Sequence, residues 1–292
     1  MSHVWLVTGS SRGLGRHVVQ AALDRGECVL ATARRPAVLE DLVVAHRGRL
    51  RTIAHDVAVP AQASAAVEAA ISAFGRLDVI VNNAGYAQLA SVEDMSDQAF
   101  RNQIEAVFFG TVHTTKAALP ILREQGRGHI INVTSVGSRM ATPGLSAYQS
   151  AKWATAGFSL VLAAEVALLG IRVTSLEPGG MATDWAGSSM AVPEISKPYQ
   201  PTVGAAAAMH DPSWRPLGDP AKVARAILEV AAMDEPPIRL LLGSEGYAYA
   251  TAAARAQLAS DEQWREVSRS TDRDDASAAE RDPLGTRSAA AA

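Results

Sequence analysis

The stretch VWLVTGSSRGLGRHVVQ, residues 4–20, places three glycines between a short apolar run and the start of a helical pattern. Four consecutive apolar residues predict a buried strand, and the apolar spacing that follows predicts a helix. Glycine tolerates positive φ and lets the backbone approach a ligand that a Cβ would repel. A helix N-terminus offers unpaired amides and partial positive charge to a phosphate. The stretch therefore predicts a phosphate-binding turn, although its spacing is not the usual G-x-G-x-x-G.

The alternation of strand and helix patterns continues along the chain. Apolar runs predict seven strands, at residues 4–9, 28–33, 51–57, 77–85, 128–135, 171–178 and 238–243. Helical patterns lie between them, at residues 14–24, 61–74, 98–124, 147–169 and 220–232. Strands that are apolar on both faces are covered on both faces, as in parallel sheets. The pattern predicts an α/β fold with a parallel sheet between two layers of helices.

Composition narrows the class of protein. The 292 residues are 48% hydrophobic and 20% charged, which is typical of a globular protein with a sizeable core. A formal charge of −3 gives no electrostatic reason to expect a nucleic acid or an anionic membrane partner. The histidines show no metal-ligand spacing, so we expect no metal. One cysteine, no signal-peptide pattern and no run of about 18 apolar residues lead us to expect a cytoplasmic protein.

The predicted organisation is one catalytic domain, residues 1–270, followed by a tail. Residues 185–219 are rich in Pro, Gly, Ser and Met, and so long an insert in a compact domain predicts a substrate loop or lid. Residues 271–292 are charged and rich in Ala and Ser, which predicts disorder.

Five motifs in chain order resemble those of the short-chain dehydrogenase/reductase family. They are the turn Thr8–Gly15, the pair Asp56-Val57, the run Asn82–Gly85, the set Ser135, Tyr148 and Lys152, and Pro178-Gly179 with Thr183. The resemblance implies a Rossmann-type doubly wound sheet and an oxidoreductase that uses a nicotinamide cofactor. The residues expected to bind the cofactor are Gly9, Ser11, Arg12, Gly13, Leu14, Gly15, Arg34, Asp56, Val57, Asn83, Ala84, Gly85, Tyr148, Lys152, Pro178, Gly179, Met181 and Thr183.

Ser135, Tyr148 and Lys152 are the expected catalytic residues. Tyr148 and Lys152 are four residues apart in a helical pattern, so their side chains lie on one face. A phenol has an ordinary pKa of about 10, and a neighbouring ammonium favours its ionised form. We therefore expect Lys152 to lower the pKa of Tyr148 toward the range useful for acid–base catalysis. Ser135 is expected to donate a hydrogen bond to the substrate oxygen.

The end of the second predicted strand indicates which nicotinamide is bound. Many relatives that use NAD carry an acidic residue there, which binds the ribose 2′-hydroxyl. This chain has Ala33 followed by Arg34, and Arg12 adds a cation in the glycine turn. A guanidinium can bind a 2′-phosphate through two hydrogen bonds. The sequence predicts NADP(H).

One position departs from the family pattern. Three residues before Gly110 the family usually has an asparagine, which kinks its helix and binds a water that links the lysine to solvent; this chain has Val107. We expect valine to do neither. Gln103, one turn earlier, could bind such a water, or the relay is dispensable or follows another route.

The expected substrate pocket is mostly apolar. Its walls would come from Tyr86, Leu89, Met140, Leu145, Trp185, Met190, Tyr199 and Trp214. Such a lining predicts a non-ionic carbonyl compound or alcohol as substrate. The expected function is NADP(H)-dependent carbonyl reduction or alcohol oxidation; the alternative is a catalytically impaired regulatory protein that binds NADP(H). The resemblance also implies a homodimer or homotetramer, formed through residues 98–124 and 147–169.

Overall fold

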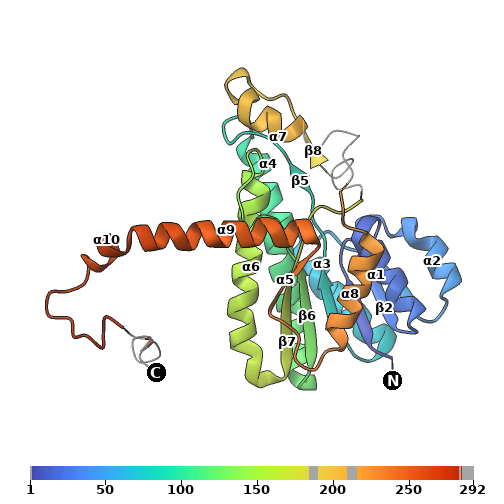
Figure 1. Ribbon diagram of the computed structural model, residues 1–292. Helices are drawn as coiled ribbons and strands as arrows, with labels where there is room; N and C mark the ends of the chain where they lie inside the picture. Colours follow the sequence, from blue (N-terminus) through green and yellow to red (C-terminus); the bar gives the residue numbers. More distant parts are fainter. Residues whose placement is uncertain (1, 184–189, 209–215, 283, 285–292) are drawn as a thin grey trace. The chain divides into compact units, whose positions relative to one another are not determined.

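The computed structural model describes residues 2–183, 190–208, 216–282 and 284 (Figure 1). The chain divides into two compact units, Met1–Ala250 and Thr251–Ala292. The first unit contains a seven-stranded parallel sheet with the strand order β3-β2-β1-β4-β6-β7-β9. Because β1 lies between β2 and β4, the strand order reverses beside β1, and ligands bind at such switch points in open α/β sheets. The predicted α/β fold is confirmed.

All seven predicted strands are present. They are β1 (Val4–Val7), β2 (Cys28–Ala33), β3 (Leu50–Ala54), β4 (Val79–Asn82), β6 (Gly128–Val133), β7 (Ile171–Pro178) and β9 (Arg239–Leu242). Adjacent strands are parallel throughout, so their carboxyl ends meet at one edge of the sheet. The motifs quoted above lie at or directly after these carboxyl ends, so they are gathered along that edge.

Strand β1 shows why these strands are apolar at every position. Its Val4 and Leu6 belong to one buried cluster and its Trp5 and Val7 to another, on the opposite face of the sheet. Side chains alternate between the faces of a strand, so a strand covered on both faces has no polar face. Full burial of one such side chain contributes about 1.5–3 kcal/mol.

Helices cover both faces (Figure 1). The Trp5 face is covered by α1 (Gly13–Asp24) and α8 (Pro220–Ala232), and the Leu6 face by α3 (Pro60–Phe74), α5 (Gly110–Gln125) and α6 (Ser146–Val166). Their ends follow local chemistry. Helix α3 starts with Pro60 and stops at Gly75, whose φ of 78° is left-handed. The Asp219 carboxylate caps the first amides of α8.

Some elements differ from the prediction. The single helix predicted at 98–124 consists of α4 (Asp97–Ile104), a π-helical segment η2 (Glu105–Phe109) and α5. Two short helices, α2 (Glu40–Ala45) and α7 (Ala205–Ala208), were not predicted. Further helical turns lie at Pro36–Leu39, Val136–Ser138, Ala167–Leu169, Lys197–Tyr199 and Gln200–Gly204.

The described part of the predicted lid is attached to the segment that follows β4. Strand β8 (Met190–Ala191) pairs with β5 (Ala87–Gln88) in a small parallel sheet. The Tyr199 hydroxyl donates to Glu93 Oε2 at 2.8 Å, and Ser196 N and Oγ bond Asp94 Oδ2 at 3.1 and 3.2 Å. Two predicted pocket residues, Trp185 and Trp214, lie outside the described residues.

The second unit begins within α9 (Ser244–Gln263) and includes α10 (Arg265–Arg269). Turns follow in the described residues up to Asp282. Most of the remaining tail, residues 283 and 285–292, lies outside the described residues. The predicted domain 1–270 and the disorder of 271–292 stay predictions.

One helix in the described part of the chain, Ser146–Leu169, is long and apolar enough to cross a membrane by length and composition. It carries Tyr148 and Lys152, both of which are buried. Core helices of soluble proteins pass the same test, and the prediction that no membrane is bound stays a prediction.

Candidate active site

The glycine turn after β1 packs directly against the motif that follows β4. Gly9 has a φ of 67°, and a Cβ there would stand 2.8 Å from Ala84 Cα. A Cβ at Gly15 would overlap the carbonyl oxygen of Gly9. Both positions therefore require glycine.

Thr8 joins these two motifs and was not among the predicted site residues. Its Oγ1 accepts hydrogen bonds from the backbone N–H of Asn83 at 3.0 Å and of Ala84 at 3.1 Å. The side-chain amide of Asn83 donates to the carbonyl oxygens of Thr8 and Gly9 at 3.0 and 3.2 Å. A hydroxyl directly before the first glycine is the only sequence signal for this role.

The N-terminus of α1 fits a phosphate group. Its N-cap residue, Arg12, makes no side-chain cap hydrogen bond, so no cap side chain occupies the first-turn amides. Gly13 has a φ of 52°, and a Cβ there would lie 3.6 Å from Thr183 Cβ. Ser11 is half-buried and Leu14 is buried beneath the turn. The predicted Thr183 thus lies next to the turn.

The ends of β2 and β3 carry the predicted adenosine contacts. Arg34 is exposed directly after β2, whose last residue, Ala33, is buried and presents no carboxylate. Asp56 is half-buried, and its Oδ1 accepts from Ala58 N at 3.1 Å. Val57 is buried against Gly110, where a Cβ would stand 2.6 Å from Val57 Cγ2. The end of β2 therefore presents a guanidinium rather than a carboxylate.

The predicted Pro178-Gly179 motif closes the other end of the site. Gly179 N donates to Leu242 O at 3.0 Å, which joins the end of β7 to β9. Met181, two residues on, pairs with Gly218 in an isolated parallel bridge. The chain then reaches Thr183 opposite α1, so the motif and the glycine turn border one site.

Ser135, Tyr148 and Lys152 are brought together on the α6 side of the sheet. Ser135 lies two residues after the end of β6 and caps the short helical turn Val136–Ser138. Its Oγ accepts from Gly137 N at 3.0 Å. The Ser135 and Tyr148 side chains are hydrogen-bonded. Lys152 Nζ donates to Val133 O at 2.6 Å and lies 5.7 Å from the centre of the Tyr148 ring. The arrangement places a hydroxyl donor, a phenol and an amine within one buried site.

The pKa of Tyr148 differs from the expectation. Burial raises the pKa of Tyr148 to about 12, and the hydrogen bond with Ser135 opposes this rise only in part. Burial also lowers the pKa of Lys152 to about 8. The predicted lowering of the Tyr148 pKa is therefore wrong for the protein by itself, because desolvation disfavours both charged forms. At neutral pH the phenol carries its proton, which suits a proton donor.

Val107, within the π-helical segment η2, and the amine of Lys152 both lie close to Gly85. A Cβ at Gly85 would stand 3.6 Å from Val107 Cγ2 and 3.9 Å from Lys152 Nζ. The helix is π-helical here with Val107 in place, and the expectation that valine does not kink it or hold a water stays a prediction. Gln103 is fully buried; its Nε2 donates to Tyr86 O at 3.0 Å and its Oε1 has no partner among the described residues.

An apolar cluster surrounds Tyr148. It consists of Ala87, Leu89, Leu145, Tyr148, Met190 and Val203, with Tyr199 packed against it. Four predicted pocket residues, Leu89, Leu145, Met190 and Tyr199, are therefore together beside the phenol. Met140 is not in this cluster.

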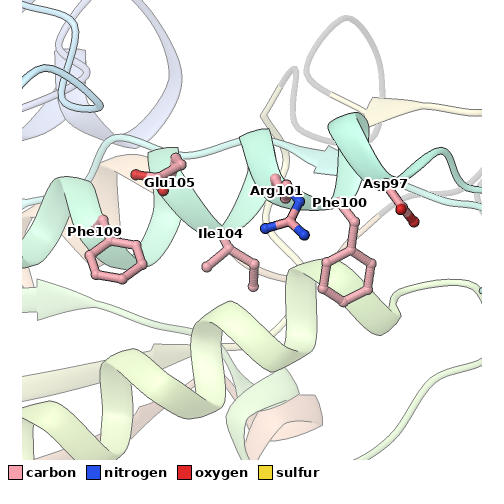
Figure 2. A pocket seen from close by; sticks show the side chains of 6 residues that line it. All are labelled: Asp97, Phe100, Arg101, Ile104, Glu105 and Phe109. Carbon is pink, nitrogen blue, oxygen red and sulfur yellow. The ribbon is translucent and has the colours of Figure 1, made fainter.

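A surface pocket of about 440 Å³ lies elsewhere, on α4 and η2 (Figure 2). It is lined by Asp97, Phe100, Arg101, Ile104, Glu105 and Phe109. Figure 2 shows Phe100, Ile104 and Phe109 on one side of this helical run. None of its residues is a predicted catalytic or cofactor residue.

Known proteins are similar to this chain over most of its length. Residues 3–192 match the short chain dehydrogenase family. The chain is 52% identical to Oxidoreductase BOA17 of Botryotinia fuckeliana, covering 92% of this chain and 98% of that one. It is 32% identical to a 3-ketodihydrosphingosine reductase of Bacteroides thetaiotaomicron, over 82% of this chain and 87% of that protein. The crystal structure of a short-chain dehydrogenase from Streptomyces avermitilis is similar, with 36% identity, a TM-score of 0.88, and coverage of 93% and 98%. The chain belongs to the short-chain dehydrogenase/reductase family.

Proposed function

We propose that the protein is an NADP(H)-dependent oxidoreductase that transfers a hydride between nicotinamide and a carbonyl or secondary alcohol of a mostly apolar small molecule. The observation that carries the proposal is the convergence of Ser135, Tyr148 and Lys152 next to an apolar cluster. A regulatory protein that only binds the nucleotide has no need of these three groups together, so the alternative of impaired catalysis has no comparable support.

Each of the three side chains has a distinct role. The Ser135 hydroxyl, which accepts from Gly137 N and is hydrogen-bonded to Tyr148, has one proton to donate, and we assign it to the substrate oxygen. Tyr148, protonated at neutral pH, supplies the proton to that oxygen during reduction. Lys152 is fixed by Val133 O beside the phenol and balances negative charge that develops there. A bound nicotinamide supplies the hydride.

In this proposal the protein prefers NADP(H) to NAD(H) because the charged side chain at the end of β2 is positive. Arg34 is exposed directly after β2 and forms no ion pair with the described residues, and no carboxylate stands at Ala33. A 2′-phosphate would meet cations there rather than a repelling carboxylate.

The apolar cluster beside Tyr148 favours a substrate with an apolar body and a reactive carbonyl group. A relative whose name is 3-ketodihydrosphingosine reductase is consistent with reduction of a ketone. The experiment is to measure NADPH consumption with a panel of ketones and aldehydes that range from charged to apolar. We expect turnover with apolar ketones. A protein that binds NADPH tightly but consumes none with any carbonyl compound would contradict the proposal.

We also propose that two copies associate through α4, η2 and α6. Large apolar side chains are exposed there, namely Phe109, Trp153, Leu160 and Val161. Contiguous exposed apolar surface is typical of interaction sites. The apolar part of the pocket in Figure 2 adjoins this surface and would accept side chains of the second copy. A cytoplasmic location remains a proposal from the sequence.

A further inference from the structure

Glu177 is a fully buried carboxylate that no step of the proposed reaction uses. It stands in β7, directly before Pro178. Its Oε2 accepts from Nε of Arg139, and its Oε1 accepts from Nε of Arg239. A buried carboxylate is strongly unfavourable unless it is paired and hydrogen-bonded. This chain therefore keeps a costly group at this place, with each oxygen assigned to a different guanidinium.

The two arginines come from different parts of the fold. Arg239 begins β9, the neighbouring strand, so its bond with Glu177 joins two strands that are already paired. Arg139 directly follows the 3₁₀ turn that Ser135 caps. The bond between Arg139 and Glu177 therefore joins the turn that carries Ser135 to the end of β7.

The same turn is attached to β7 at its start as well. Thr134 N and Oγ1 both donate to Leu176 O, at 2.7 and 2.8 Å. Within the turn, the Ser138 hydroxyl donates to Ser135 O at 2.7 Å. Leu176 and Glu177 of β7 thus bind the turn at both ends, through Thr134 and Arg139.

The turn has little room to move toward α6. A Cβ at Gly137 would stand 3.1 Å from Gln149 Nε2 and 3.4 Å from Ser135 Oγ. Gln149, next to Tyr148 in the chain, is itself fixed because its Oε1 accepts from Thr142 N at 2.8 Å. The contact between Ser135 and Tyr148 therefore depends on where β7 places the turn.

From these contacts we infer that Arg139 and Glu177 are a positioning pair that keeps Ser135 in hydrogen-bonding contact with Tyr148, whereas Arg239 serves only to stabilise the buried carboxylate. The inference rests on the proposed function, because it assigns the pair an effect on turnover through Ser135. Neither residue of the pair is a catalytic residue, since neither touches the reacting groups.

The two arginines provide a matched comparison, since their side chains are 27% and 28% exposed and each bonds one oxygen of the same carboxylate. We expect Arg139→Ala to lower kcat about 10- to 100-fold, the range that a misplacement of about 1 Å produces. NADPH affinity, measured by fluorescence titration, should change less than about twofold. Arg139→Lys, which keeps a cation beside Glu177, should recover part of kcat. Arg239→Ala should lower the melting temperature and leave kcat within about threefold. Equal losses of kcat in Arg139→Ala and Arg239→Ala would overturn the inference.

A double-mutant cycle separates positioning from general destabilisation. Because Arg139 acts through Ser135, Arg139→Lys should have no further effect on kcat in a Ser135→Ala background. An additional loss there equal to that in the wild type would show an effect independent of Ser135 and overturn the inference. Different results would overturn the proposed function and the positioning pair. Full turnover by Ser135→Ala would overturn the proposed function, whereas an inactive Ser135→Ala beside a fully active Arg139→Ala would overturn only the positioning pair.

Discussion

Lys152 Nζ lies 5.7 Å from the centre of the Tyr148 ring and donates to Val133 O, so the amine is fixed beside the phenol by the strand β6 rather than by a carboxylate. The consequence is electrostatic. Burial without a counter-charge lowers the pKa of Lys152 to about 8, and burial raises the pKa of Tyr148 to about 12. At neutral pH the pair consists of an ammonium and a neutral phenol, the states in which reduction can begin.

The pH dependence of reduction follows from the pKa of Lys152. Since the amine loses its proton as pH rises through about 8, kcat/KM for ketone reduction should fall through that value. Val107 is buried, lies close to Gly85 as the amine does, and has no side-chain group that could form a hydrogen bond. Val107→Asn places a polar amide in the neighbourhood of the ammonium, so we expect it to raise the pKa of Lys152 and move the decline to higher pH.

The measurement for this prediction is kcat/KM from about pH 6 to about pH 10 for the wild type, Val107→Asn and the apolar control Val107→Leu. The control should keep the wild-type inflection. An inflection at the same pH in Val107→Asn would show that the valine does not set the pKa of Lys152.

The same burial of the Lys152 ammonium lowers the free energy of unfolding of the protein. The pKa of Lys152 is lowered in the folded protein, so the cost of the buried charge is fully present below pH 8 and disappears as pH rises toward 10.5. Lys152→Met should therefore raise the free energy of unfolding by about 2 kcal/mol at pH 7, after loss of the bond to Val133 O. The gain should shrink above pH 8. Urea unfolding at pH 7 and at alkaline pH tests this, and a less stable Lys152→Met at pH 7 would refute it.

The proposed preference for NADP(H) depends on Arg34. Arg34→Asp places a carboxylate where a 2′-phosphate would bind, so we expect the KM for NADPH to rise at least about tenfold, with little change for NADH. Arg35→Asp, at the neighbouring exposed position, is the matched control and should change the ratio far less. Equal effects of Arg34→Asp on both nucleotides would remove the basis for an NADP(H) preference.

Association of two copies should depend on the exposed face of α6. Trp153 is 53% exposed although it lies one residue from the buried Lys152. Trp153→Arg puts a charge in the proposed interface and should convert the protein to monomers, whereas Leu258→Arg, at an exposed position of α9, should not. Sedimentation velocity distinguishes these states. A wild-type protein that is monomeric at all concentrations would contradict this part of the account.

The sequence predicts the seven strands and the glycine turn because these depend on local chemistry. Strand β1 is apolar at each position, and Gly9 must adopt a positive φ, so both leave a pattern in the chain. The bond of Arg139 with Glu177 leaves no such pattern, because it joins residues far apart in the sequence.

Two further features depend on tertiary structure. The π-helical segment around Val107 could not be predicted from residues 98–124, because their apolar and polar residues alternate with the period of an ordinary α-helix. Whether the pKa of Tyr148 is raised or lowered depends on how completely the side chain is buried. The spacing of Tyr148 and Lys152 in the sequence carries no information on burial.

The most direct test of the account is Tyr148→Phe, which removes only the phenolic oxygen from a buried ring. The measurement is NADPH oxidation with the best ketone substrate, together with NADPH affinity by fluorescence titration on the same preparation. We expect turnover to fall by at least about 100-fold while the affinity for NADPH stays within about twofold. Wild-type turnover in Tyr148→Phe, with the nucleotide bound normally, would contradict the central claim that this hydroxyl supplies the proton.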